Sequence, residues 1–232
     1  YMRAYNIFQG FSYNVLPIAM DKYGISIDEL DKSSANVTYV TPSHQYPLGI
    51  VMPITRRLEL LKWANQGERY IIEDDHDSEF RYKGKPIPSL QGIDTKEKVI
   101  YLGTFSRALT KALRIGYMVL PKDLYHIYKT NFNYYSSTVS RVDQHILTGF
   151  IEGGYFERHL NKMRKIYKSK QERLIKTLRV FADKVEVDGE HAGLHLVVRF
   201  LTHMNEDAII AIANKNNIKL YPLSKHYINV SN

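Results

Sequence analysis

The sequence has 232 residues, 44% of them hydrophobic and 24% charged, which is an ordinary globular composition with enough chain for one or two domains. It has no cysteine, so disulfides and thiolate chemistry are excluded, and no apolar run reaches the ~20 residues of a membrane-spanning helix. The net charge of +8 favours a polyanionic partner such as DNA, although the scattered basic residues fit equally well a basic surface that binds none.

The first half of the chain alternates short apolar strands with helical or looped segments. Residues 1–14 carry no start signal and resemble the middle of a domain, and residues 1–11 do not read as a secretion signal, so we expect a cytoplasmic protein. The sequence predicts helices at residues 27–30 and 54–66, and strands at residues 37–41, 69–72, 99–102 and 115–120. This alternation is typical of a largely parallel sheet covered on both faces.

The second half has a different pattern. The sequence predicts helices at residues 124–132, 141–152 and 207–214, a long basic helix at 155–181, and strands at 185–187, 194–200 and 218–221. We therefore expect a large α/β domain over residues 1–150, followed at residues 151–232 by a long linking helix and a smaller α+β domain.

Five segments together resemble one protein family. They are residues 39–49, 72–82, 103–117, 154–160 and 192–196. In this order, and over nearly the whole chain, they are similar to the C-terminal domain of MocR/GabR-type transcription regulators of the GntR superfamily.

The resemblance carries implications for fold and partners. It implies the α/β fold of the fold-type I aminotransferases, which hold pyridoxal 5'-phosphate (PLP), and a homodimer. It also implies an N-terminal winged-helix DNA-binding domain, which is absent from this sequence, as are the glycine-rich loop before Tyr1 and the end of the small domain after Asn232. By this comparison we expect a fragment truncated at both ends.

The resemblance also assigns residues to a PLP site. It places Asp74 against the pyridine nitrogen, where a carboxylate keeps the ring protonated as an electron sink. It places Ser106 and Arg114, and more weakly Thr104, at the phosphate, where hydroxyl and guanidinium groups are good donors. In the alternative reading, Arg114 forms an internal salt bridge.

The acidic run has its own alternative reading, in which Asp74, Asp75 and Asp77 all cap the end of a strand. We expect Asp75 and Asp77, in either case, to cap the following turn or face water.

Two positions depart from the family pattern. Arg107 stands where the family carries the Schiff-base lysine, and a guanidinium with a pKa above ~12 does not supply the neutral amine. Lys111 lies four residues on; if the segment were helical, it would be displaced by a turn of about 6 Å, too far to substitute. His76 stands where the family usually has a tyrosine that donates to the cofactor's phenolic oxygen. The departures indicate a pocket whose chemistry has changed, with PLP bound noncovalently at most or absent.

Other polar residues are weaker candidates. His44, Gln45 and Tyr46 follow the end of a strand, where ligand crevices form in α/β sheets, so they line an effector pocket or a plain polar loop. The basic residues Arg158, His159, Arg164 and Lys165 favour a solvated helix face over a DNA contact. His191 and His195 have no acidic partner at metal-ligand spacing, so the sequence predicts no metal site.

Three functions fit these observations. The favoured one is the effector-sensing and dimerisation domain of a DNA-binding regulator, which binds a small molecule without turnover. The alternatives are a PLP-dependent aminotransferase, which Arg107 argues against, and a dimerisation scaffold that binds no ligand.

Overall fold

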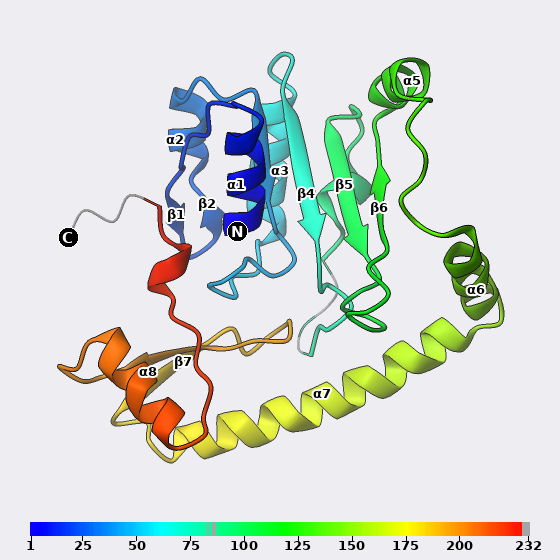
Figure 1. Ribbon diagram of the computed structural model, residues 1–232. Coiled ribbons are helices and arrows are strands. Elements are labelled where there is room, and N and C mark those ends of the chain that lie inside the picture. Colours follow the sequence, from blue (N-terminus) through cyan, green and yellow to red (C-terminus); the bar gives the residue numbers. More distant parts are fainter. Residues whose placement is uncertain (83, 85–86, 229–232) are drawn as a thin grey trace.

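A four-stranded sheet organises the first half of the molecule (Figure 1). The computed structural model describes residues 1–82, 84 and 87–228. The sheet has the order β3 (Val37–Val40), β4 (Tyr70–Asp75), β5 (Val99–Thr104) and β6 (Gly116–Val119). The first three strands run parallel and β6 runs antiparallel to β5. The four predicted strands and the largely parallel sheet are confirmed.

The hydrophobic core lies between this sheet and the helices of the first half. Helices α2 (Ile27–Lys32) and α3 (Ile54–Ala64) contribute Leu30, Leu60 and Trp63, which pack with Ile71 of β4 and Val99 of β5. Every residue of β6 is exposed, so the expectation of a sheet covered on both faces is wrong at this edge strand.

The remaining elements of the first half are short. Helix α1 (Met2–Gly10) was not anticipated, because its N-cap residue Tyr1 offers no side-chain cap. Strands β1 (Met20–Asp21) and β2 (Gly24–Ile25) pair antiparallel, and α4 (Leu90–Ile93) is capped by Ser89. Residues 105–115, between β5 and β6, form turns and bends. They do not form the helix that was considered for the segment from Arg107 to Lys111.

The second half is dominated by one long helix (Figure 1). After α5 (Lys122–Asn131) and α6 (Arg141–Glu152), helix α7 (Tyr155–Arg179) leads to the antiparallel pair β7 (Val185–Asp188) and β8 (Val197–Phe200), then to α8 (Glu206–Lys215) and the 3-10 turn η1 (Ser224–His226). In the described part of the chain no helix combines the length and apolar character needed to cross a membrane. The division into domains at residues 150 and 151 stays a prediction.

The strand predicted at residues 218–221 is wrong. The amide of Ile218 donates to the carbonyl of Ala213 at 2.9 Å, and Asn217 adopts a left-handed conformation with a φ of 58°. These contacts end α8 in the manner of a helix C-cap and use the amide that a strand would need. The strand predicted at 194–200 is confirmed only over Val197–Phe200.

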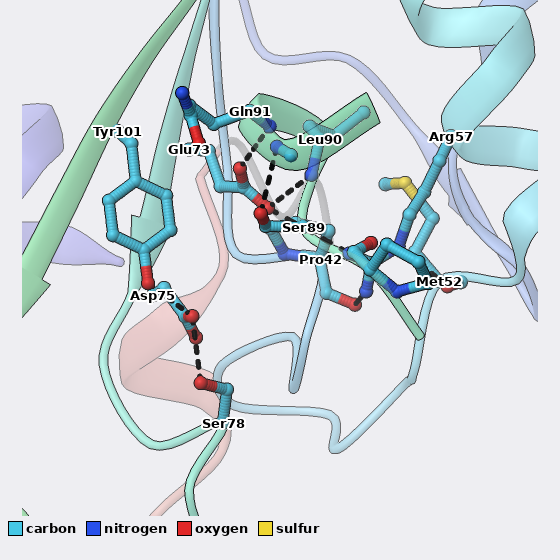
Figure 2. Close-up of polar contacts among 12 residues, drawn as sticks. Pro42, Met52, Arg57, Glu73, Asp75, Ser78, Ser89, Leu90, Gln91 and Tyr101 are labelled. Atoms are coloured by element: carbon cyan, nitrogen blue, oxygen red, sulfur yellow. Dashed lines mark hydrogen bonds and ion pairs between the residues drawn. The ribbon is translucent and has the colours of Figure 1, made fainter. Parts of the chain in front are cut away.

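A buried guanidinium joins two loops to the core (Figure 2). Arg57 of α3 has a side chain only 1% exposed and donates to the carbonyls of Met52, Pro88 and Pro42 at 3.2, 2.8 and 3.0 Å. Its nearest carboxylate is Glu73 of β4, at 3.8 Å.

Glu73 is itself fully buried and accepts from the amides of Leu90 and Gln91, both at 2.9 Å. Burial raises the pKa of Glu73, although these amides and Arg57 act in the opposite direction. Arg57 and Glu73 thus tie the segments around Pro42, Met52 and Pro88 to the central strand.

We predict that Arg57→Met destabilises the protein by about 3–5 kcal/mol, because it leaves three carbonyls without their donor and removes the cation beside buried Glu73. The measurement is urea-induced unfolding monitored by circular dichroism. Arg199→Met is the matched control: Arg199 pairs with Glu186 at 2.7 Å but both side chains are exposed, so a change below about 1 kcal/mol is expected. Equal losses in the two variants would contradict the role given to Arg57.

Candidate functional site

The candidate binding residues predicted from the sequence lie at the carboxyl ends of the parallel strands. His44, Gln45 and Tyr46 follow β3, and Asp74 and His76 lie at and just beyond the end of β4. Thr104, Ser106 and Arg107 end or follow β5, and Arg114 precedes β6. Because the carboxyl ends of parallel strands share one edge, the fold brings these loops together at the position where α/β sheets bind ligands.

The three acidic residues after Ile72 have three different sets of partners. The carboxylate of Asp74 accepts a short hydrogen bond from the hydroxyl of Tyr39 on β3. Asp75 accepts from Tyr101 at 2.6 Å and from Ser78 at 2.7 Å (Figure 2). Asp77 pairs with His44.

These partners decide between the readings of the acidic run. Asp75 bonds into the following turn through Ser78, as expected of a capping residue, whereas the side chain of Asp77 is buried against His44 and neither caps the turn nor faces water. Asp74 is half-buried and bonds across to a neighbouring strand rather than capping its own.

The loop after β5 presents hydrogen-bond donors at the same edge. Thr104 is used by the loop itself: its hydroxyl donates to the carbonyl of Ile115 at 3.3 Å and accepts from the amide of Ser106 at 3.1 Å. Among the described residues, the side chains of Ser106, Arg107 and Arg114 have no hydrogen-bond or ion-pair partner. The internal salt bridge considered for Arg114 is therefore not formed within the part of the chain that is described.

Arg107 and Arg114 are both exposed, and Arg114 has a left-handed φ of 45°. Lys111 is exposed as well. The loop thus carries positive charge and donors that can hold an anion.

A histidine cluster occupies the adjacent loops. His44 Nδ1 lies 3.1 Å from Asp77 Oδ2, with side chains only 0% and 2% exposed. The Nε2 of His76 lies 3.5 Å from Asp77 Oδ1. The ring of His195 packs 4.4 Å from that of His44 and its Nε2 donates to the carbonyl of Pro47 at 2.9 Å.

Tyr46 extends this cluster toward the C-terminal part of the chain. Its ring lies 5.3 Å from His195 and 5.0 Å from His226, edge to face in both cases, and its hydroxyl is 3.5 Å from Nε2 of His226. Gln45 turns inward, where its side chain accepts from Thr41 at 2.9 Å. The histidines of the two halves of the chain therefore meet at one edge of the sheet.

Charges in the cluster are set by burial and by neighbouring groups. Burial alone would raise the pKa of Asp77, but the hydrogen bond from His44 and the nearby rings of His76 and His195 lower it overall. Burial, aided by His44, lowers the pKa of His195 to about 4, so His195 is neutral at pH 7. Asp77 is then the negative charge around which the imidazoles gather.

Sequence reasoning missed this pairing. The sequence predicts a turn position for Asp77 because its partner His44 lies 33 residues away. It predicts no acidic neighbour for His195 because the loop that His195 contacts, at Pro47, lies 148 residues away. The available signal was local: a histidine within four residues of the end of each of two predicted strands, at His44 and His76. His191 is exposed and contributes its carbonyl to Tyr82 rather than its ring to the cluster.

Helix α7 contacts the same loops from below (Figure 1). Arg164 donates to the carbonyl of Glu79 at 2.6 Å, and His159 Nε2 lies 3.1 Å from the carbonyl of Ala108. The expectation of a solvated face is therefore wrong for these two residues. Arg158, which packs on Tyr155, and Lys165 are exposed.

The site partly fits a PLP-type cofactor. The half-buried carboxylate of Asp74 and the uncommitted donors of Ser106, Arg107 and Arg114 suit a ring nitrogen and a phosphate. The primary amine does not fit, since Lys111 lies in a separate, exposed turn. The described residues at this edge thus supply an acid and donors for a phosphate, and no described lysine pairs with Asp74.

We predict that Gly193→Ala disrupts the cluster. Gly193 has a φ of 75°, and a Cβ there would collide with the buried ring of His44. The matched control is Gly154→Ala: Gly154 has a similar φ of 68°, but its Cβ would meet only the end of Arg158 at 3.5 Å. We expect Gly193→Ala to cost about 1–3 kcal/mol more than the control in urea unfolding. Equal costs would show that His44 yields freely.

Comparisons with known proteins place the chain among regulators and aminotransferases. No family model matches it. It is 42% identical over 228 residues to the uncharacterized HTH-type transcriptional regulator YdeL of Bacillus subtilis, covering 98% of this chain and 49% of that protein. It is 34% identical over 231 residues to the probable rhizopine catabolism regulatory protein MocR of Rhizobium meliloti, covering 98% and 46%.

Among solved structures, it superposes on the kynurenine aminotransferase of Pyrococcus horikoshii with a TM-score of 0.82 and 26% identity, covering 96% of this chain and 57% of that one. This likeness confirms the expected aminotransferase-like α/β fold. The chain spans about half the length of the curated relatives it matches.

Proposed function

Because this chain belongs with the MocR-type HTH transcriptional regulators, matching about half of each relative, we propose that it is the effector-sensing and dimerisation domain of such a regulator. The proposal rests mainly on the similarity to a transcriptional regulator over 98% of the chain. It also rests on Arg107, which stands where the family resemblance predicts the Schiff-base lysine. We infer a cytoplasmic location, since the whole protein must reach DNA.

The site residues would bind a ligand without forming a covalent bond to it. Asp74, already oriented by Tyr39, would hold a protonated ring nitrogen at its carboxylate. Ser106, Arg107 and Arg114 would hold a phosphate or carboxylate, and His76 would donate a hydrogen bond to a ring oxygen. PLP, when bound, supplies an electron sink. A guanidinium keeps its proton at neutral pH, so Arg107 would hold an anion rather than attack an aldehyde.

His44, Gln45 and Tyr46 would form the wall of the effector pocket that faces the second half of the chain. Tyr46 supports this role, because it already contacts His195 and His226 from that half. An effector acts by binding one arrangement of these parts more tightly than another.

We further propose a homodimer and a separate DNA-binding domain in the whole protein. The exposed apolar side chains of β6 and α5 support a self-association surface, and Tyr117, Met118, Tyr125 and Tyr128 are between 46% and 49% exposed. The part of the relatives that this chain does not cover would carry the winged helix that binds DNA.

The main test distinguishes noncovalent binding from covalent attachment. We expect the protein incubated with PLP and then borohydride to show no added cofactor mass by intact-protein mass spectrometry, whereas Arg107→Lys gains a reducible adduct because it supplies an amine. Lys111→Arg is the control and should behave like the unmodified protein.

A reducible adduct in the unmodified protein, together with transfer of an amino group to a keto acid, would establish the aminotransferase alternative instead. Calorimetry tests the scaffold alternative: absence of saturable heat with PLP, pyridoxamine phosphate and amino acids would favour a domain that binds no ligand.

A further inference from the structure

We propose that His44, His76 and Asp77 form a binding site for a divalent transition-metal ion. The inference goes beyond the proposed regulatory function and stands or falls separately from it. One nitrogen from each histidine and one carboxylate oxygen lie within 4.8 Å of one another, on loops that follow the adjacent strands β3 and β4.

The separations of the candidate ligand atoms are close to those around a bound ion. Two ligands of a tetrahedral ion with bonds of ~2.1 Å lie ~3.4 Å apart. The Nε2 of His76 is 3.5 Å from Asp77 Oδ1, and Nδ1 of His44 is 3.1 Å from Asp77 Oδ2. Each histidine therefore approaches one oxygen of the Asp77 carboxylate at about the spacing of two ligands on one ion.

Buried polar atoms in the cluster lack hydrogen-bond partners. Asp77, only 2% exposed, has no hydrogen-bond donor for Oδ1 among the described residues, and Nε2 of the fully buried His44 also lacks a partner there. Buried carboxylates without full hydrogen bonding are unfavourable. An ion between Asp77 and His76 would satisfy Oδ1, and binding through Nδ1 of His44 would place the proton of the neutral imidazole on Nε2.

The fold holds the ligands in place before any ion arrives. The ring of His44 packs against Gly193, which leaves no room for a Cβ, and against the ring of His195. His195 is fixed in turn by its bond to Pro47. Such outer contacts orient metal-binding imidazoles and are part of a functional site.

The donor set indicates the class of ion. Two imidazoles and one carboxylate suit Zn²⁺, Co²⁺, Ni²⁺ or Cu²⁺ better than Mg²⁺ or Ca²⁺, which prefer oxygen ligands. Three protein ligands leave at least one coordination position for water or an anionic ligand.

The experiment uses tag-free protein dialysed against EDTA and then titrated with Co²⁺, monitored by visible absorption, with Zn²⁺ as competitor and no PLP present. We expect one equivalent to bind with the intense visible spectrum of low-coordinate Co²⁺. His76→Asn should weaken binding at least about tenfold, because loss of a direct ligand costs no less than loss of an outer contact. His76 is 16% exposed, which makes it the ligand most tolerant of substitution.

His203→Asn is the matched control, since His203 is exposed and lies outside the cluster. It should bind Co²⁺ as the unmodified protein does. Circular dichroism verifies the fold of each variant, and if His76→Asn is unfolded, the same titration is made with His76→Gln. A second readout is the thermal unfolding midpoint, which Zn²⁺ should raise in the unmodified protein and not in the His76 variant. Absence of one-to-one binding, or equal affinities of the His76 and His203 variants, would overturn the proposal.

Discussion

The guanidinium of Arg57 holds the loops on which the site residues stand. It donates to carbonyls at Pro42 and Met52, which bracket the loop carrying His44 and Tyr46, and to Pro88, next to the amides that Glu73 binds. Removing a buried charged group from such a network is unfavourable, because its partners stay desolvated. The same interaction that stabilises the core therefore fixes the position of the first loop relative to the strand that ends in Asp74.

Much of the fold was predictable because the signals were local. Runs of β-branched and aromatic residues located the four strands of the sheet, and the amphipathic pattern located α3 and α7. The errors have local causes as well: α1 lacks a capping side chain, and the amide of Ile218 closes α8 instead of pairing with a strand. The candidate site was predictable only where strand ends define it, as for Asp74 and Thr104. The pairing of His44 with Asp77 and the approach of His195 depend on contacts between distant segments, which no local pattern encodes.

The side chains of the loop after β5 decide whether this fold can bind a ligand covalently. The aminotransferase-like fold keeps the carboxylate of Asp74 and a set of exposed cationic side chains near one edge, a combination that suits the proposed zwitterionic or anionic ligand. Covalent capture requires in addition an amine whose pKa can be lowered, and arginine does not provide one. Recognition and catalysis are thus separable on this scaffold, which is consistent with regulators and aminotransferases among its relatives.

Helix α7 connects the loops at the sheet edge mechanically to the second half of the chain. It is 25 residues long, or about 37 Å, and its first half is pinned to two loops of the sheet edge through Ala108 and Glu79. Its far end leads into β7, beyond which Gly193 returns to touch His44. If the helix tilts as a rigid rod by about 3° at Arg164, its end at Arg179, about 22 Å away, would move by about 1.2 Å. A shift of either loop would therefore reach, through the far end of the helix, the segment that brings Gly193 against the ring of His44.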